Sequence, residues 1–339
     1  MDYSGASAYV YAKASGMIGK AFAGQNAERL FAVKSLAELW GLLFESEVPS
    51  VPEVMLANRI EKDAHRLFVK QYLSLLDIYE KPSRFLVDLI RRYEVGNLKQ
   101  LTSALSLGEK PHTPLNLGKY AVFNYKAWPD IRSLTHGTEF AWCNTVPAVD
   151  GRAELAHKLD IQEFKILWRD LNAVPGDAGQ ALLRYFQHEY SILNMIWALR
   201  LRVYYKMTRD QIVPHLLYAA DSALASDPIC AYAWEVLDRS LDVYEEWKSW
   251  KFAALLNPHE EGAPWKIDPM WLEQKARIAA AHKTRKVFHR YPMTDVSLAM
   301  FFRIKQQELN CIRAAAECIR LNADKTEAMY VAGLAGETQ

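Results

Sequence analysis

The sequence is poor in glycine and cysteine and has no long apolar run. It contains 15 glycines among 339 residues, which is below the roughly 7% usual for proteins. Few glycines argue against sheets joined by tight turns and against loops that cradle phosphates. The scattered cysteines favour buried free thiols in a reducing compartment over a disulfide framework. They are Cys143, Cys230, Cys311 and Cys318.

Charge of one sign is also lacking, since 41 Lys and Arg residues nearly balance 40 Asp and Glu residues. That balance argues against a nucleic-acid-binding surface of high basic density. No run of about 18 or more apolar residues exists, so no membrane-spanning helix is predicted. Residues 1–19 lack the charged-then-apolar layout of a signal peptide. We therefore expect a cytoplasmic protein that can sit on a membrane protein without entering lipid.

What the sequence does contain is long segments rich in Ala, Leu, Glu, Lys and Arg, which favour helices. The expected fold class is all-α. Residues 176–207 are apolar around most of the helix circumference and predict a central, buried element. Residues 109–151 contain prolines, asparagines and aromatics, which predict irregular structure with short helices. Helical spacing of apolar residues predicts helices over 9–23, 26–44, 53–79, 82–107, 160–172, 176–207, 229–256, 271–291 and 293–321.

A weak internal repeat runs through the chain. Three times a proline, at Pro82, Pro175 and Pro292, precedes a long predicted helix that carries an acidic residue near its middle. The repeat predicts three similar helical units. Their boundaries are residues 1–118, 119–222 and 223–339.

Charged and amide residues recur at related positions in these three helices. Aligning Glu94 with Glu308 also aligns Lys99 with Arg313. Each basic residue lies too far from its glutamate for an i,i+4 pair, so we expect a contact with a neighbouring helix. In the second helix the acidic and amide residues are further apart, and its register stays open. The candidate repeat-signature or interface residues are Glu94, Asn97, Lys99, Glu189, Asn194, Arg200, Glu308 and Arg313.

Fragments that imitate active-site motifs each lack a required residue. Residues 16–20 have the wrong spacing for a phosphate-binding loop, and Ala21 stands where a magnesium-binding hydroxyl is needed. His188 and Glu189 begin like a zinc-protease helix, but Ile192 occupies the position of the second histidine.

Two histidines of the predicted helix 271–291, His282 and His289, lie seven residues apart on one face. No further ligand stands at suitable spacing, so a solvated or interface-facing pair is the preferred interpretation. No nucleophile and base are paired anywhere in the sequence. We predict no catalytic residue, no cofactor and no metal, and hence a protein that is not itself an enzyme.

Four segments together resemble the C subunit of bacterial and archaeal V/A-type rotary ATPases, whose eukaryotic counterpart is the d subunit. Residues 9–14, Tyr-Val-Tyr-Ala-Lys-Ala, are similar to the tyrosine-rich opening helix of that family. Residues 94–99 resemble its acidic–Asn–Leu–Lys signature, and residues 194–202 resemble the second copy. Residues 302–313 resemble the Lys–x–x–Glu helix near its C-terminus.

The resemblance implies a funnel of three similar helical domains in pseudo-threefold arrangement. It implies a place on the cytoplasmic end of the membrane rotor ring, where the funnel receives the tip of the shaft formed by subunits D and F. The work would be mechanical, passing torque between ATP hydrolysis or synthesis and proton or sodium transport. The expected partners are the shaft and the ring, with no nucleic acid and no direct lipid insertion.

A tetratricopeptide-type helical-repeat scaffold for protein–protein interaction is the alternative. Residues 318–328 resemble the end of one such unit and the start of the next. Residues 226–234 show a second resemblance to the same pattern. Asp227 and Asp324 lie about 97 residues apart, close to three periods of ~34 residues. No copy stands between them, so the rotary subunit is the preferred interpretation.

Overall fold

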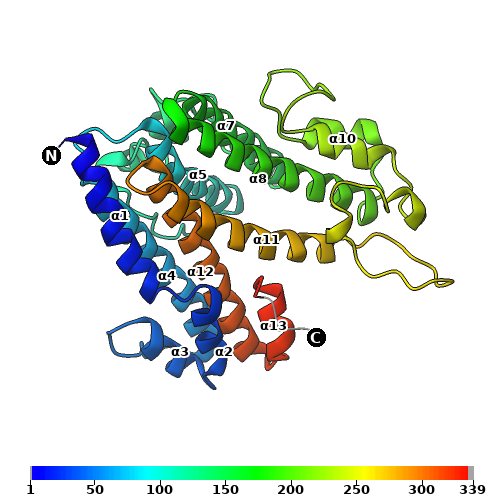
Figure 1. The fold of residues 1–339 in the computed structure, drawn as a ribbon. Coiled ribbons are helices and arrows are strands. Elements are labelled where there is room, and N and C mark those ends of the chain that lie inside the picture. The colour runs from blue at the N-terminus through cyan, green and yellow to red at the C-terminus, as the bar shows by residue number, and fades with distance from the viewer. Residues whose placement is uncertain (1, 335–339) are drawn as a thin grey trace.

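The computed structural model describes residues 2–334, and every regular element in that range is helical (Figure 1). This confirms the predicted all-α class. The long helices are α1 (Tyr3–Lys20), α4 (Glu53–Leu76), α5 (Arg84–Leu107), α7 (Arg152–Asn172), α8 (Gly176–Val203), α11 (Pro269–Arg290) and α12 (Asp295–Leu321). The short ones are α2 (Glu28–Ala32), α3 (Leu36–Leu43), α6 (Ile131–Thr135), α9 (Arg209–Ile212), α10 (Ala231–Asp238) and α13 (Lys325–Val331). Six 3₁₀ turns complete the described elements: Gly24–Ala27, Gly118–Tyr120, Tyr125–Ala127, Val213–His215, Tyr244–Glu246 and Ala253–Leu255.

Three pairs of long helices, α4–α5, α7–α8 and α11–α12, are each joined by a short turn that contains a proline of the sequence repeat. Proline disfavours helical backbone in the residue before it, which ends α11 at Arg290, since Tyr291 precedes Pro292. The first helices of the other two pairs end earlier, α4 at Leu76 and α7 at Asn172. The turn before α8 is tight, because a Cβ on Gly179 would lie 1.9 Å from the carbonyl oxygen of Val174. At the far end of α5, Gly108 takes the left-handed conformation with φ of 67° and stops the helix.

The single helix predicted over residues 26–44 is wrong. The chain forms α2, leaves helical geometry at Val33 with ψ of 157°, and starts again as α3. Ser35 caps this new start by accepting a hydrogen bond from the Glu38 N–H. The break lets the two short helices bury different faces, with Phe31 in one and Trp40 in the other.

The long helix predicted over residues 229–256 is also wrong, since only α10 forms there, followed by two 3₁₀ turns. Arg239 is extended after α10, and the following loop folds back so that Trp247 is fully buried. The Trp247 indole N–H donates to the Ser240 carbonyl at 2.7 Å. The large aromatic side chain of Trp247 is therefore buried although the backbone that carries it is a loop. Two other helices begin before their predicted starts: α7 at Arg152, eight residues before Asp160, and α1 at Tyr3, six residues before Tyr9.

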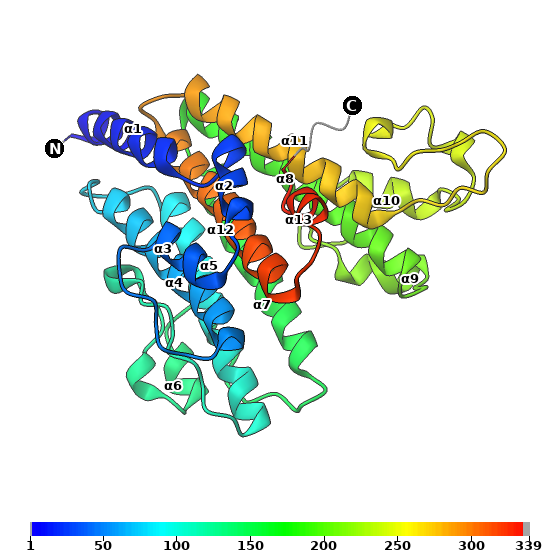
Figure 2. The same cartoon turned by 90° about the horizontal axis from the view of Figure 1, so that it is seen from below.

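The long helices pack in a closed order. The second helix of each pair lies against the first helix of the next pair, so that α5 packs on α7 and α8 packs on α11. The third pair returns to the first, because α12 packs along α4 (Figure 2). A tetratricopeptide array would leave its first and last repeats apart, since each repeat contacts only its neighbours. The packing of α4 on α12 does not fit that alternative.

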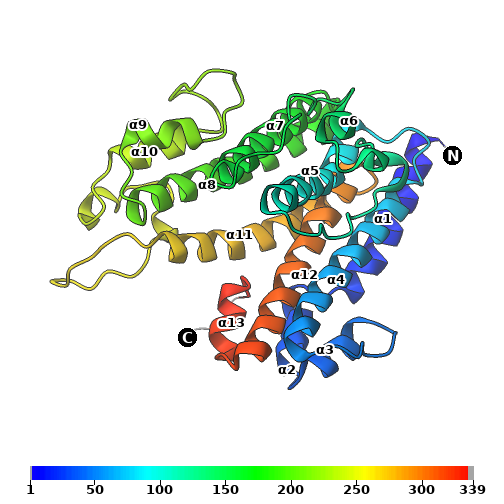
Figure 3. The same ribbon diagram turned by 180° about the vertical axis from the view of Figure 1, so that it is seen from behind.

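Near their starts, α5, α8 and α12 contribute to one hydrophobic core. Near their ends, α5 and α8 contribute to two other hydrophobic clusters. The first halves pack together through aromatic rings, with Phe85 of α5 and Phe186 of α8 5.2 Å apart between centroids and Tyr93 of α5 and Phe302 of α12 6.5 Å apart. The second half of α8 belongs to another hydrophobic cluster, which includes Trp247. The second half of α5 belongs to a third. Figure 3 shows α8 and α12 running to different parts of the molecule.

Candidate functional site

The two signature asparagines make the same contact on different helices. The Asn97 amide nitrogen on α5 donates to the Leu115 carbonyl at 2.9 Å, and its oxygen accepts from the Leu115 N–H at 2.9 Å. On α8, Asn194 does the same to Leu217, at 2.7 Å and 2.9 Å. Both asparagines are buried. Each one therefore fixes the irregular segment that follows its helix to the middle of that helix.

These contacts set the register that the sequence left open. Matching Asn194 with Asn97 places Ser191, and not Glu189, at the position of Glu94. The position that corresponds to Asn97 on α12 is Cys311. Its Sγ lies 4.0 Å from the Ala332 carbonyl oxygen, again in the segment that follows the helix.

Glu94 and Glu308 are both buried and both accept hydrogen bonds from backbone N–H groups. Glu94 accepts from Val122 at 3.1 Å and from the Tyr125 hydroxyl at 2.9 Å. Burial raises the pKa of the Glu94 carboxyl, and these donors oppose that rise. Glu308 accepts from the Phe22 N–H at 2.7 Å and pairs with Lys305, which is buried as well. These two signature glutamates thus connect distant segments of the chain.

The three basic signature residues each pair with the first helix of the next helix pair. Lys99 on α5 pairs with Asp160 on α7, and Arg200 on α8 pairs with Glu273 on α11.

The third ion pair links the last helix pair back to the first. The Arg313 Nε on α12 donates to Glu61 on α4 at 2.8 Å, across 252 residues of sequence. The ion pairs therefore follow the same closed order as the helix packing.

Glu189 has a different role from the other signature residues. It faces α12, where its carboxylate lies 3.2 Å from the Arg303 guanidinium. That guanidinium also sits 4.8 Å from the centroid of the Phe186 ring. Glu189 thus lies at the junction of α8 and α12, where the shared core begins to separate.

Sequence reasoning missed an exposed apolar stripe on α8, because it predicted that helix to be buried around most of its circumference. Leu193, Trp197 and Tyr204 are 51%, 39% and 53% exposed. With Arg200 they follow the i, i+4, i+7, i+11 spacing of one helix face. No sequence signal singled out this face, because apolar residues also occupy the other sides of α8. Exposed apolar groups that line up in this way are typical of interaction surfaces.

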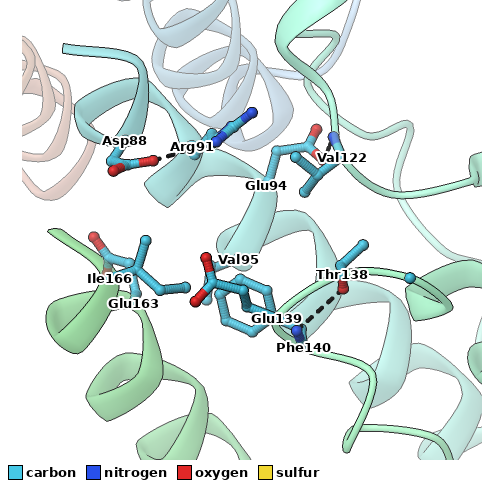
Figure 4. A pocket seen from close by; sticks show the side chains of 11 residues that line it. Asp88, Arg91, Glu94, Val95, Val122, Thr138, Glu139, Phe140, Glu163 and Ile166 are labelled. Carbon is cyan, nitrogen blue, oxygen red and sulfur yellow. Dashed lines mark hydrogen bonds and ion pairs between the residues drawn. The ribbon is translucent and has the colours of Figure 1, made fainter. Parts of the chain in front are cut away.

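A cavity of about 340 Å³ lies beside Glu94, between α5 and α7 (Figure 4). Asp88 and Arg91 line it from α5, and Glu163 lines it from α7. Burial, with the neighbouring Asp170 carboxyl as the next cause, raises the pKa of Asp88 to about 7. Thr138 also lines the cavity, and its hydroxyl donates to the Thr135 carbonyl at 2.7 Å and accepts from the Phe140 N–H at 3.1 Å.

Two further features bear on function. Within residues 2–334, no group of three or more His, Cys, Asp or Glu side chains is arranged to hold a metal ion. In the same part of the chain, no helix has the length and apolar character needed to cross a membrane.

Comparison with known proteins gives a family. The family model for the ATP synthase (C/AC39) subunit matches residues 10–329. An uncharacterized protein of Treponema pallidum (strain Nichols) is 29% identical over 337 residues, covering 96% of this chain and 98% of the relative. The match to the family model spans all three helix pairs and every signature residue described above. The chain therefore belongs to the ATP synthase (C/AC39) subunit family, as a subunit of a V/A-type ATPase.

Proposed function

We propose that this chain is the central-stalk adaptor of its ATPase, linking the rotor shaft of the catalytic head to the membrane rotor ring. The observation that carries the proposal is the closed order of helix packing, α5 on α7, α8 on α11 and α12 on α4. A body that passes torque must resist twisting. Each helix pair here contacts both of the others, so rotation of one pair is opposed by the other two.

The three helix pairs are, in this proposal, the cores of three related units at residues 1–118, 119–222 and 223–339, in a funnel-like pseudo-threefold arrangement. The matching contacts of Asn97 and Asn194 support a common origin for the first two units. The ion pair between Arg313 and Glu61 supports closure of the third onto the first. A pseudo-symmetric adaptor suits a partner that is itself a ring.

The diverging second halves of α5, α8 and α12 form the proposed seat for the shaft, made of subunits D and F. The apolar stripe of Leu193, Trp197 and Tyr204 on α8 supports this placement, since it offers large side chains to a partner. The chain itself is proposed to be non-catalytic. It would lie on the cytoplasmic side of the membrane, held peripherally by the ring, and couple ATP turnover to proton or sodium transport.

The proposal is tested by mixing the purified chain with the D–F shaft and measuring co-elution and affinity. Replacing Leu193 and Trp197 together with serine should weaken binding by about tenfold or more, because both side chains lose contact area with the shaft. A double serine variant of Val54 and Met55 is the matched control. These residues are 64% and 58% exposed on α4, away from the stripe.

Two results would overturn the proposed shaft-binding surface. One is failure of the unmodified chain to co-elute with the shaft at any salt concentration between about 50 and 500 mM, a range over which screening changes strongly. The other is an equal loss of affinity in both double variants. Binding of the chain to isolated rotor rings, measured in the same way, tests the other half of the proposed linkage.

A further inference from the structure

Helix α11 is strongly basic, in contrast to the chain as a whole. It carries six lysines and arginines and a single glutamate, Glu273, whereas the whole chain has a net charge of +1. The rest of the chain is therefore net acidic. Figure 1 shows α11 lying across the front of the molecule with no other element drawn over it.

Most of this charge has no partner within the chain. Glu273 pairs with Arg200 and Arg277. Among residues 2–334, no carboxylate lies within ion-pair distance of the other five basic side chains of α11. Those five are Lys275, Lys283, Arg285, Lys286 and Arg290.

Lys275 and Arg290 lie over aromatic rings of their own segment, 5.1 Å from the Trp271 centroid and 5.9 Å from the Tyr291 centroid. Two others of the five contact different elements. Lys283 lies 5.8 Å from the centroid of the Tyr185 ring on α8. The Arg285 guanidinium covers Gly24, where an added Cβ would lie 2.5 Å from it. Their positive charge is therefore held against the body of the protein and does not project from it.

The remaining charges share one face with a small residue. Lys275, Ala279, His282, Lys286 and Arg290 follow the spacing i, i+4, i+7, i+11 and i+15, which places them along one side of the helix. We call this set the basic face of α11. All but the half-buried Lys275 are exposed. At a rise of 1.5 Å per residue the face is about 22 Å long.

We propose that the basic face of α11 binds an acidic helix of a partner protein, with Asp or Glu side chains repeating every three or four residues. The three cations of this face, Lys275, Lys286 and Arg290, lie along one side of the helix over about four turns. A helix with carboxylates along one side can place one opposite each of them. Ala279 leaves room for close approach in the middle of this face. The proposal concerns a different surface from the stripe on α8 and does not depend on the shaft-binding role.

A lipid surface fits this face less well. Helices that lie in a membrane interface combine a basic side with large apolar side chains that enter the lipid. Within α11, the only large apolar side chain more than one third exposed is Met270, in the first turn. Nucleic acid is disfavoured by the net charge of the whole chain.

The first test uses the complex isolated through a tag on the full chain, treated with a zero-length carbodiimide that joins lysines to carboxylates. Mass spectrometry should find Lys275 and Lys286 joined to Asp or Glu residues about eleven positions apart in one segment of another protein, because the two lysines are about 16 Å apart along α11. Lys70, Lys81 and Lys126, which are also exposed, serve as internal controls and should not join to that segment. Cross-links from α11 only to its own chain would overturn the proposal.

The second test compares two charge-reversed variants of the full chain. The variant Lys275→Glu, Lys286→Glu, Arg290→Glu should be retained about tenfold less well in the complex at ~150 mM salt. The control variant Lys70→Glu, Lys81→Glu, Lys126→Glu should be retained like the original chain. Since Lys286 and Arg290 are exposed and Lys275 is half-buried, the test variant should unfold at nearly the same temperature as the original chain. A loss of retention in a variant with a lowered unfolding temperature would count against the proposal.

Vesicles with and without phosphatidylglycerol test the lipid alternative on the isolated chain. The proposal expects no binding to either at ~150 mM salt. Binding to the anionic vesicles that disappears in the α11 variant, and not in the control variant, would assign the face to lipid and overturn the proposal.

Discussion

Asn194 holds Leu217 through both backbone groups, donating to its carbonyl at 2.7 Å and accepting from its N–H at 2.9 Å. Asn97 holds Leu115 in the same way from the equivalent point on another helix. A side-chain amide is well suited to this task, since it has one donor and one acceptor group side by side. The two asparagines therefore position the segments that follow α5 and α8.

The first prediction concerns these asparagines. Replacing Asn97 or Asn194 with alanine should lower the free energy of unfolding by about 2 kcal/mol, because it removes two or more hydrogen bonds and leaves buried groups unpaired. Urea denaturation followed by circular dichroism measures the change. Asn310, which is exposed on α12, is the control, and its alanine variant should change stability by less than about 0.5 kcal/mol. Equal effects at all three positions would show that the backbone contacts add nothing.

The second prediction concerns the three ion pairs that link successive helix pairs. Alanine variants of Lys99 and Arg313 should each lower stability by less than about 1 kcal/mol, because their pairs are partly exposed. Arg200 should matter most, since its side chain and that of Glu273 are 34% and 24% exposed and Glu273 also pairs with Arg277. Double-mutant cycles at each pair give the coupling energies. A larger coupling for Arg313 than for Arg200 would contradict this order.

Much of the fold could be predicted because the helical spacing of apolar residues and the prolines between helices can be read from short stretches of sequence. They located both helices of each pair, with boundaries near those observed except at the start of α7, which lies eight residues before the predicted one. They failed at residues 26–44 and 229–256, where apolar spacing continues but the chain breaks at Val33 and Arg239. In the second case the burial of Trp247 from a loop outweighs helix propensity. That is a tertiary effect that no window of sequence contains.

The candidate site was predictable only in part, for a related reason. The repeat identified the positions of Lys99 and Arg313, and their shared offset from a glutamate indicated a contact with another helix. Which helix, and that the order closes from α12 onto α4, depends on contacts across more than 200 residues. The exposed stripe on α8 was hidden because apolar residues occur nearly all round that helix, so periodicity alone does not say which side stays uncovered.

The third prediction concerns pH. Asp88 is buried beside Asp170, and the pKa of Asp88 is raised to about 7, by burial first and then by the Asp170 carboxyl. Arg91 opposes the rise, while Arg169 and Arg84 help to lower the pKa of Asp170. The raised pKa means that the folded state keeps a proton that the unfolded state loses near pH 4. The resulting stability is present below pH 4 and is lost as pH rises through about 7.

An Asp88→Asn variant should remove this dependence, because the amide can donate to the Asp170 carboxylate at every pH. Between pH 5 and pH 8 the unmodified chain should lose on the order of 2 kcal/mol relative to the variant. Denaturant titrations at several pH values measure this difference. Asp130 is the control, since its carboxyl is exposed and its pKa is lowered by hydrogen bonds from Ser133, which places its titration well below this window. Parallel pH curves for Asp88→Asn and the unmodified chain would contradict the prediction.

The fourth prediction concerns the buried pair of Lys305 and Glu308, whose side chains are 8% and 7% exposed. Replacing Lys305 with methionine should lower stability by about 3 kcal/mol, because the Glu308 carboxylate stays buried without its cation. Glu308→Gln should have a comparable cost, since it leaves the ammonium unpaired. The double variant buries no charge, and its glutamine oxygen can still accept from the Phe22 N–H. It should therefore be more stable than either single variant, with a coupling of about 2 kcal/mol or more in the cycle. Additive losses would mean that the two charges are solvated and that the hydrogen bond to Phe22 alone fixes the turn after α1.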